Sequence, residues 1–165
     1  MGTWITDLFN GTSLAILGAA LSMLLAGTGS AKGVGIAGEA AAGVLTEDPN
    51  KFGQTLLLQA LPGTQGIYGM IISFLIMTKI GLIGGGSVAR LDMYTGLQFL
   101  FASLPIAFVG LTSGIAQGRA SAACMGIIAK RPEELGKAMM YPALVETYAV
   151  LALLISFLMW LGITV

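Results

Sequence analysis

Histidine is absent from this sequence, cysteine occurs once, and charged residues make up only 10% of the chain, against about 25% in an ordinary soluble domain. Without imidazole, serine-protease-like catalysis and zinc sites built on histidine are excluded. The lone Cys124 excludes a disulfide scaffold. Eight basic residues cancel eight acidic ones, so the chain has no basic field with which to neutralise the phosphates of a nucleic acid.

Apolar residues dominate what is present. They make up 56% of the 165 positions, and the mean hydropathy is +0.88, which excludes intrinsic disorder and indicates an integral membrane protein. Charge is nearly absent from four stretches, which are 8–31, 52–78, 93–118 and, with Glu146 as its one charge, 138–165. Each stretch is long enough for one membrane-spanning helix of about 20 residues. We therefore predict an all-α membrane protein with four transmembrane helices, at about 8–45, 53–80, 93–129 and 135–163.

The segments between these helices are short and polar. Residues 46–51 and 130–134 each combine a proline with charges, which is typical of a tight turn. Residues 84–91 begin with three glycines, but no strand precedes them and no Gly-Lys-Ser/Thr follows, so a link between hairpins is favoured over a phosphate-binding loop. We expect a first hairpin (1–83), this glycine-rich loop, and a second hairpin (92–165). Asp7 and the lack of a basic leading segment favour a retained first helix over a cleaved signal peptide.

The basic residues near the spans favour one orientation in the cell membrane. Four of them lie at the two turns: Lys51, Lys130, Arg131 and Lys137. Only Lys79 and Arg90 lie on the opposite side. Because basic residues accumulate on cytoplasmic loops, we expect cytoplasmic turns and external chain termini. Lys32, Glu39 and Arg119 fall toward the turn ends of their helices, where long side chains reach the interface and lipid head groups.

The sequence contains an internal repeat. Residues 72–75 (ISFL) recur as 155–158, a spacing of 83 residues, and a spacing of 85 aligns the glycine-containing segments 29–33 and 114–118. We interpret the chain as a duplicated helical hairpin. At the first spacing Gly63 corresponds to Glu146, so one hairpin carries a carboxylate inside a span where the other carries glycine.

Small residues crowd the first and third helices. Gly110, Gly114 and Gly118 are spaced four apart and therefore share one helix face. Faces of this kind allow two backbones to approach closely in lipid. One explanation is a single contact between two helices of a bundle. The number of glycines and alanines in both helices favours the other explanation, a ring in which many such helices are crowded together.

Glu146 is the one carboxylate well inside an apolar span. Placing a charged side chain at the bilayer centre costs about 2.5–3.5 kcal/mol on insertion scales. A neutral glutamic acid that hydrogen-bonds two helices together is the structural explanation. The functional explanation, which we favour, is a group that carries a proton or a cation within a shielded site.

Oxygen-bearing groups in two other helices favour a cation. Pro62 lacks an N–H and disturbs the preceding turn, which frees backbone carbonyls up to Leu61. Thr64 and Gln65 follow directly, and Gln117 stands alone in an apolar run. Each glutamine on its own is explained by interhelical hydrogen bonding. Together with Glu146 these groups supply the carboxylate, carbonyl and hydroxyl oxygens that a hard cation such as Na⁺ prefers, and Tyr68 is placed to donate its O–H to the carboxylate.

These residues stand in segments that resemble the proteolipid rotor subunits (subunit K) of bacterial V-type ATPases, with the greatest likeness to the sodium-pumping branch. The segments are 29–35 (GSAKGVG), 61–69 (LPGTQGIYG), 103–108 (SLPIAF), 113–118 (SGIAQG) and 145–149 (VETYA), and the similarity covers nearly the whole chain. The resemblance implies a four-helix subunit repeated in a ring that turns against a stator. The middle loop is longer than is expected for the family.

The resemblance also implies a ligand set and partners. The Na⁺ ligands would be the Leu61 carbonyl, Thr64, Gln65, Gln117 and Glu146, with Tyr68 bonded to the carboxylate and Pro62 and Gly63 behind them. The partners would be identical subunits, a stator subunit with an essential arginine, lipid, and central-stalk subunits at the turns. ATP would be hydrolysed elsewhere in the complex, so this subunit would have no catalytic site. A proton-carrying rotor, a small secondary transporter and a structural pore are the alternatives.

Overall fold

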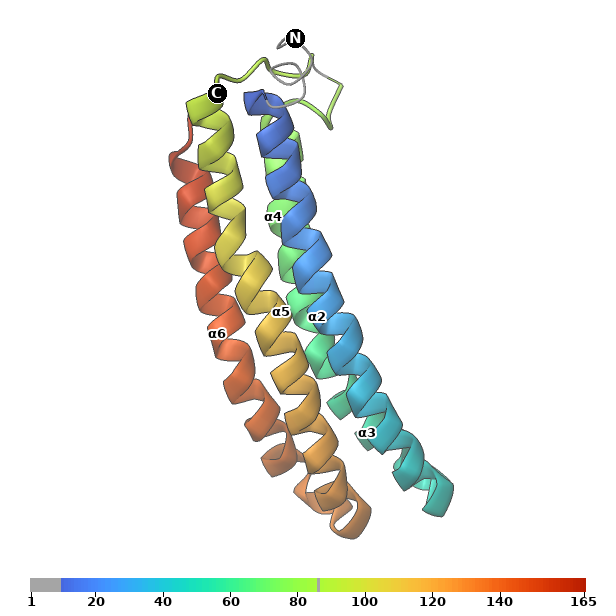
Figure 1. Cartoon of the computed structure of the whole chain (residues 1–165). Coiled ribbons are helices and arrows are strands. Elements are labelled where there is room, and N and C mark those ends of the chain that lie inside the picture. The colour runs from blue at the N-terminus through green and yellow to red at the C-terminus, as the bar shows by residue number, and fades with distance from the viewer. Residues whose placement is uncertain (1–9, 86) are drawn as a thin grey trace, which may run out of the picture.

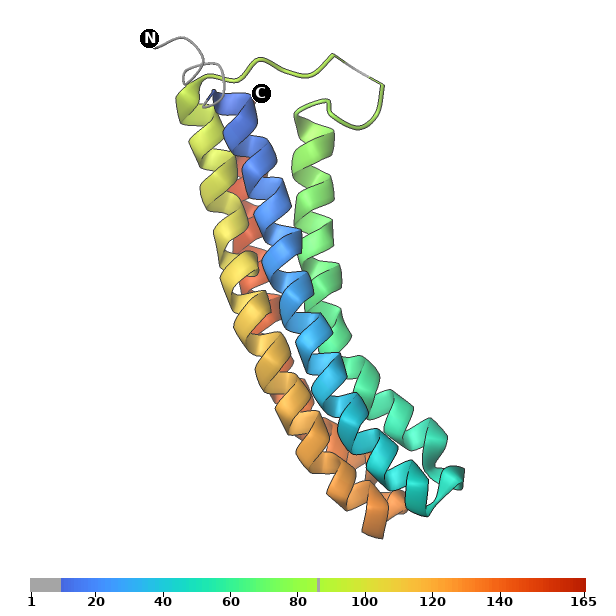
Figure 2. The ribbon, with the colours of Figure 1, turned by 45° about the vertical axis from the view of Figure 1, so that its right-hand side comes forward.

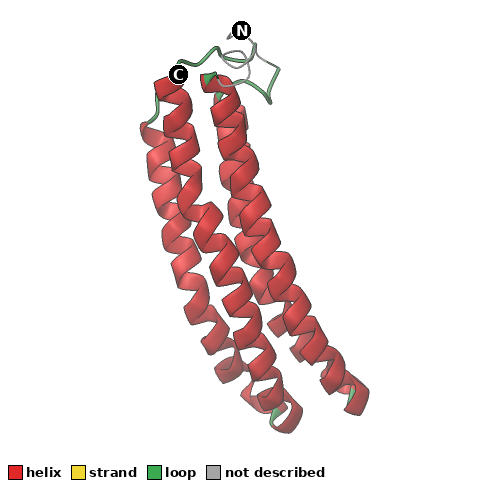
Figure 3. Cartoon of the chain, in the orientation of Figure 1, coloured by secondary structure: helices red, strands yellow, loops and turns green. Residues whose placement is uncertain are grey.

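The computed structural model describes residues 10–85 and 87–165. Residues 8 and 9 of the expected first helix, Asp7, and residue 86 of the glycine-rich loop lie outside the described part. All regular secondary structure in the described residues is helical (Figure 3). The elements in chain order are α2 (Gly11–Glu47), a 3-10 turn (Pro49–Lys51), α3 (Phe52–Ala60), a 3-10 turn (Leu61–Gly63), α4 (Thr64–Lys79), α5 (Met93–Lys130), a 3-10 turn (Pro132–Glu134) and α6 (Leu135–Gly162).

The helices form two antiparallel hairpins that lie side by side. The first consists of α2 with α3 and α4, and the second of α5 with α6; the start of α2 and the C-terminus lie at one end and the two tight turns at the other (Figure 1). Helix α2 lies between α4 and α5 (Figure 2). Four helical segments in the described residues are long and apolar enough to cross a membrane. The all-α, four-span fold expected from the sequence is confirmed.

Glycines bring α2 and α5 into backbone contact. A Cβ atom on Gly33 would lie 2.2 Å from the carbonyl oxygen of Gly114, and one on Gly118 would lie 2.3 Å from the Cα of Gly33. No side chain fits at such distances, so the contact requires glycine. The small-residue face of α5 is therefore explained by a contact inside one chain. Contrary to the expectation from the sequence, these glycines do not by themselves argue for a ring.

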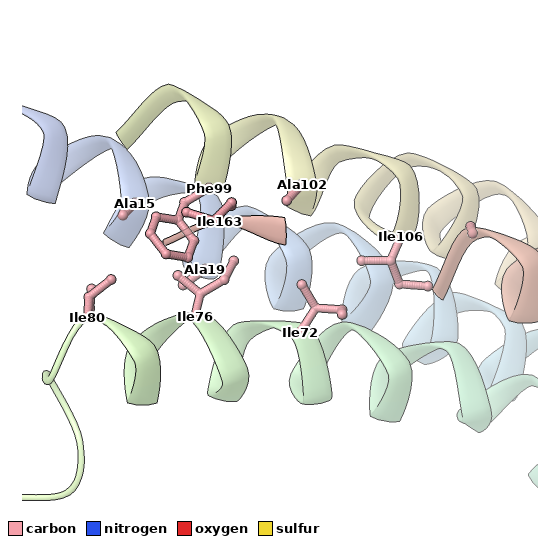
Figure 4. Packing of buried hydrophobic residues seen from close by; sticks show 10 residues of the cluster. Ala15, Ala19, Ile72, Ile76, Ile80, Phe99, Ala102, Ile106 and Ile163 are labelled. Carbon is pink, nitrogen blue, oxygen red and sulfur yellow. The ribbon is translucent and has the colours of Figure 1, made fainter. Parts of the chain in front are cut away.

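Two apolar clusters lie toward opposite ends of the bundle. Near the chain termini, Ile72 and Ile76 of α4 point toward Phe99 and Ala102 of α5 and Ala19 of α2 (Figure 4). A second cluster lies near the turns, and its members are Ala41, Val44, Leu58, Cys124, Met125, Ile128 and Ala138. The polar residues at the middle of the spans are left between these two clusters.

Side chains cap the helix ends. Asp92 accepts a hydrogen bond from the Thr95 backbone N–H at 2.7 Å, and this bond lowers the pKa of its carboxyl group. Two lysines of the first hairpin bond to backbone carbonyls of the second hairpin. Lys51 donates to the Ala129 carbonyl at 2.6 Å, and Lys79 donates to the Trp160 carbonyl at 2.8 Å. Cations are favourable at the C-terminal ends of helices, so both lysines join the hairpins.

At the terminal end, Trp160 makes two further contacts with the first hairpin. The Lys79 ammonium lies 4.5 Å from the centroid of the Trp160 ring, and the Trp160 indole donates to the Leu75 carbonyl at 3.1 Å. We expect Lys79→Met to lower the free energy of unfolding by about 1 kcal/mol through loss of the cation–π contact and the cap. Thermal unfolding in detergent measures this, with Lys137→Met as the control because Lys137 pairs with Glu134 at an exposed turn. Equal shifts in the two variants would contradict the role of Lys79.

Candidate ion-binding site

A break in the second span begins the site. Pro62 is buried and ends the regular hydrogen bonding of α3, and the chain passes through the 3-10 turn Leu61–Gly63 before α4 starts at Thr64. The Leu61 carbonyl oxygen accepts hydrogen bonds from the backbone N–H of Thr64 and, at 3.1 Å, from its hydroxyl. The break thus places a backbone carbonyl and a hydroxyl next to each other inside a span.

Two buried glutamines continue the site from α4 into α5. Gln65 and Gln117 are both 0% exposed. The Gln65 amide nitrogen donates to the Gln117 amide oxygen, and the Gln117 amide nitrogen donates to Glu146 Oε2 at 3.4 Å. Among the described residues, the Gln65 amide oxygen is buried without a hydrogen-bond partner. Within the described ranges, Gln54 Oε1, Ser113 Oγ and Ser121 Oγ are buried without a partner as well, but only the Gln65 oxygen belongs to a residue in the hydrogen-bond chain that ends at Glu146. A cation at this place would satisfy it.

Glu146 receives a hydrogen bond on each carboxylate oxygen. It lies near the middle of α6 and is half-buried. The Tyr68 hydroxyl of α4 donates to Oε1 at 2.7 Å, opposite the Gln117 bond to Oε2. The carboxylate is therefore held from two neighbouring helices. On its open side it borders a groove lined by Ala143, Thr147, Val150 and Leu151.

The chemistry of this set suits a small monovalent cation. Its donors are carboxylate, amide, carbonyl and hydroxyl oxygens, which are the ligands of hard cations. Only Glu146 among them carries a charge. One bound monovalent cation or one proton would therefore neutralise the site, and neutrality removes the cost of a carboxylate inside a bilayer.

The structure brings the residues expected from the sequence into one region. Tyr68, Glu146, Gln117 and Gln65 form a continuous chain of hydrogen bonds. Leu61 and Thr64 bond to each other in the turn before Gln65. Gly63 takes no part in these bonds, and a Cβ there would meet only Val34, at 3.8 Å.

One residue near the site is not predicted from the sequence. Ser30 of α2 accepts a hydrogen bond from the Gly66 backbone N–H at 2.7 Å, and both residues are buried. The sequence offers one indication of its role. Ser30 places a hydroxyl between Gly29 and Gly33, whereas the repeat spacing of 85 residues places Ile115 at the equivalent position of the second half.

Comparisons with known proteins agree with the duplicated four-helix fold. The family of ATP synthase C subunits matches the chain twice, over residues 17–76 and 100–159, which confirms the duplicated hairpin. The V-type sodium ATPase subunit K of Enterococcus hirae is 52% identical over 152 residues, which cover 92% of this chain and 93% of that protein. The A-type ATP synthase subunit K of Methanocaldococcus jannaschii is 38% identical over 150 residues, which cover 91% of this chain and 63% of that protein.

Proposed function

Since this chain belongs to the family of ATP synthase C subunits, we propose that it is a rotor-ring subunit of a V-type ATPase that carries Na⁺ across the membrane on Glu146. The observation that carries this proposal is the hydrogen-bond chain from Tyr68 through Glu146 and Gln117 to the unsatisfied oxygen of Gln65. This set of residues supplies more oxygens than proton binding requires. The sodium ATPase subunit that shares 52% of its residues supports the same cation.

The proposed Na⁺ ligands are the Leu61 carbonyl oxygen and side-chain oxygens of Thr64, Gln65, Gln117 and Glu146. In each glutamine the oxygen and nitrogen lie at the two arms of one amide, so a half-turn of the amide presents the oxygen to a cation. The Tyr68 hydroxyl bonds Glu146 Oε1 from outside this set and fixes the orientation of the carboxylate. The first hairpin (1–83) thus supplies the carbonyl, hydroxyl and one amide, and the second (92–165) supplies the carboxylate and the other amide.

The proposed transport of Na⁺ across the membrane depends on the charge of Glu146. The carboxylate loads Na⁺ from one half-channel of a stator subunit and crosses the lipid-facing part of the ring in neutral form, because the ionised form is costly there. A stator arginine then displaces the ion at a second half-channel. Each charge moved works against about 2.3 kcal/mol per 100 mV, and ATP hydrolysed in another subunit supplies that energy.

The ends of the molecule have separate proposed roles. Lys51, Lys130 and Arg131 lie in the turns 46–51 and 130–134 and Lys137 follows closely, against Lys79 and Arg90 at the other end, which favours the cytoplasmic side for the turns and the external side for the chain termini. Central-stalk subunits would dock on these turns. Identical subunits would flank each copy in the ring.

ATP-driven uptake of radioactive Na⁺ tests the proposal. We would measure it in inverted membrane vesicles that hold the complex assembled with this chain. Direct Na⁺ carriage predicts that a proton uncoupler leaves uptake intact. Uptake abolished by the uncoupler would instead favour a proton-carrying rotor coupled to a separate antiporter.

Tyr68→Phe is expected to weaken Na⁺ binding without abolishing it. The variant removes only the hydroxyl that holds Glu146 Oε1. A hydrogen bond to a charged group contributes about 1.5 kcal/mol or more, so the half-saturating Na⁺ concentration should rise about tenfold. The Na⁺ dependence of ATP hydrolysis by the complex measures this. Tyr148→Phe is the control because Tyr148 is 67% exposed on α6, and an equal shift in the two variants would contradict the role of Tyr68.

A further inference from the structure

The first turn of α4 is capped by another helix. Gly66 is the third residue of α4, and its backbone N–H donates to the Ser30 hydroxyl of α2 at 2.7 Å. Ser30 is only 7% exposed, and Gly66 is buried. The bond therefore lies inside the bundle, shielded from competing water.

The break at Pro62 creates the need for this cap. The first N–H groups of a helix have no partner within it and are ordinarily satisfied by the side chain at the N-cap. The N-cap of α4 is Gly63, which has no side chain. The Thr64 N–H is satisfied by the Leu61 carbonyl of the 3-10 turn, and the Gly66 N–H bonds the Ser30 hydroxyl from outside the helix. A donor left unsatisfied in the bilayer would cost several kcal/mol.

Close contacts fix α2 against this turn. A Cβ on Gly33 would lie 2.8 Å from Pro62 Cβ, and one on Gly69 would lie 2.4 Å from the Ser22 carbonyl oxygen. A Cβ on Gly66 itself would lie 3.2 Å from Ser30 Oγ. Glycines on both sides of the bond thus allow the approach that brings the hydroxyl to the N–H.

At the equivalent place the second half has neither the break nor a serine, although a related bond occurs elsewhere in it: the Ser156 hydroxyl of α6 accepts a hydrogen bond from the backbone N–H of Ile106, beside Pro105 of α5, at 3.2 Å. At the repeat spacings Pro62 corresponds to Val145, Gly66 to Ala149 and Ser30 to Ile115. Helix α6 is continuous from Leu135 to Gly162, so it has no internal N-terminus to cap. In both halves a buried serine thus satisfies a backbone N–H of a proline-containing span, and in the first half that N–H belongs to the turn that carries Thr64 and Gln65.

We infer that Ser30 is a positioning residue of the ion site. By satisfying the Gly66 N–H it holds the first turn of α4, which carries Thr64 and Gln65, in place beside α2. Ser30 itself does not touch the cation. This inference rests on the proposed function.

Equilibrium binding of radioactive Na⁺ to the purified ring tests the inference. Ser30→Ala should raise the half-saturating Na⁺ concentration about fivefold, the effect of one lost hydrogen bond. Ser30→Thr, which keeps the hydroxyl, should restore binding. Ser30→Cys has a side chain of similar size whose sulfur accepts hydrogen bonds only weakly, so its half-saturating Na⁺ concentration should lie between those of Ser30→Ala and wild type. This variant replaces Ser30→Ala in the experiment if the Ser30→Ala ring cannot be purified.

Ser22→Ala is the matched control. Ser22 is buried in the same helix, and its hydroxyl donates to the Ala19 carbonyl of that helix at 2.8 Å, so its loss should leave Na⁺ binding unchanged. A further readout separates positioning from general loosening: without Na⁺, the rate at which a hydrophobic carbodiimide labels Glu146 should be the same in Ser30→Ala and wild type.

The outcomes distinguish this inference from the function on which it rests. Wild-type Na⁺ affinity in Ser30→Ala, or weakened binding shared by Ser22→Ala and Ser30→Thr, would overturn the role of Ser30 alone. Absence of Na⁺ binding in the wild-type ring would overturn the sodium site and this inference together.

Discussion

Replacing Glu146 with glutamine is expected to abolish ATP-driven Na⁺ transport while leaving the four-helix fold in place. Glutamine has nearly the same shape, and its amide oxygen can still accept the Tyr68 hydroxyl that bonds Glu146 at 2.7 Å. The variant loses the one charge of the ligand set, and with it the means to hold a monovalent cation in lipid. Na⁺ uptake by vesicles that contain the variant ring should fall to background.

The matched control is Glu39→Gln. Glu39 is an exposed carboxylate of α2, outside the hydrogen-bond chain of the site, so its neutralisation should leave uptake at the wild-type level. Glu146→Asp adds a graded test: it keeps the charge but shortens the side chain by one methylene, and Na⁺ affinity should fall without complete loss. Uptake that persists in Glu146→Gln would contradict the assignment of the carrier.

Gly118→Ala is expected to prevent the two hairpins from packing together. A Cβ at this position would lie 2.3, 2.4 and 2.6 Å from the Cα, carbonyl oxygen and carbonyl carbon of Gly33. These are backbone atoms, which cannot turn away as a side chain can. Overpacking of this kind costs about 3 kcal/mol, so the dodecyl sulfate concentration that unfolds the protein should fall sharply.

A glycine-to-alanine substitution elsewhere on α5 should not destabilise the protein. Gly126 is exposed and a Cβ there meets nothing within 4 Å. Alanine is favoured over glycine in a helix by about 0.5–1 kcal/mol, so Gly126→Ala should be neutral or stabilising in the same titration. Destabilisation of equal size at the two positions would show that the contact between α2 and α5 is not the cause.

The fold could be predicted because the membrane imposes a simple pattern. Each span needs a charge-free stretch of fixed minimum length, and Pro49 and Pro132 mark the turns in both halves. The glycines of α2 and α5 could be recognised as a close-contact surface, but their partner could not. Spacing alone does not show whether such a face meets a helix of the same chain or of a neighbour, and the structure places Gly33 against Gly114 and Gly118.

The polar groups of the site could be identified because they are rare in apolar spans. Pro62 and Glu146 stand out by residue type, and Gln117 by its isolation. Their hydrogen bonds could not be predicted, since the contacts of Glu146 with Tyr68 and Gln117 depend on the rotation of three helices about their axes. Ser30 escapes prediction because serine is an ordinary small residue at a helix contact, and its partner is a backbone N–H that no residue type reveals.

Labelling of Glu146 by a hydrophobic carbodiimide, with and without Na⁺ at one fixed pH, tests most directly whether this carboxylate binds the ion. The reagent adds to a carboxyl group in the membrane, so a bound cation should block it. We expect Na⁺ to protect Glu146, with K⁺ at the same ionic strength as the control. Protection that comes only from raising the pH would contradict the sodium site in favour of a proton, and no labelling under any condition would contradict the role of Glu146 as an ion carrier.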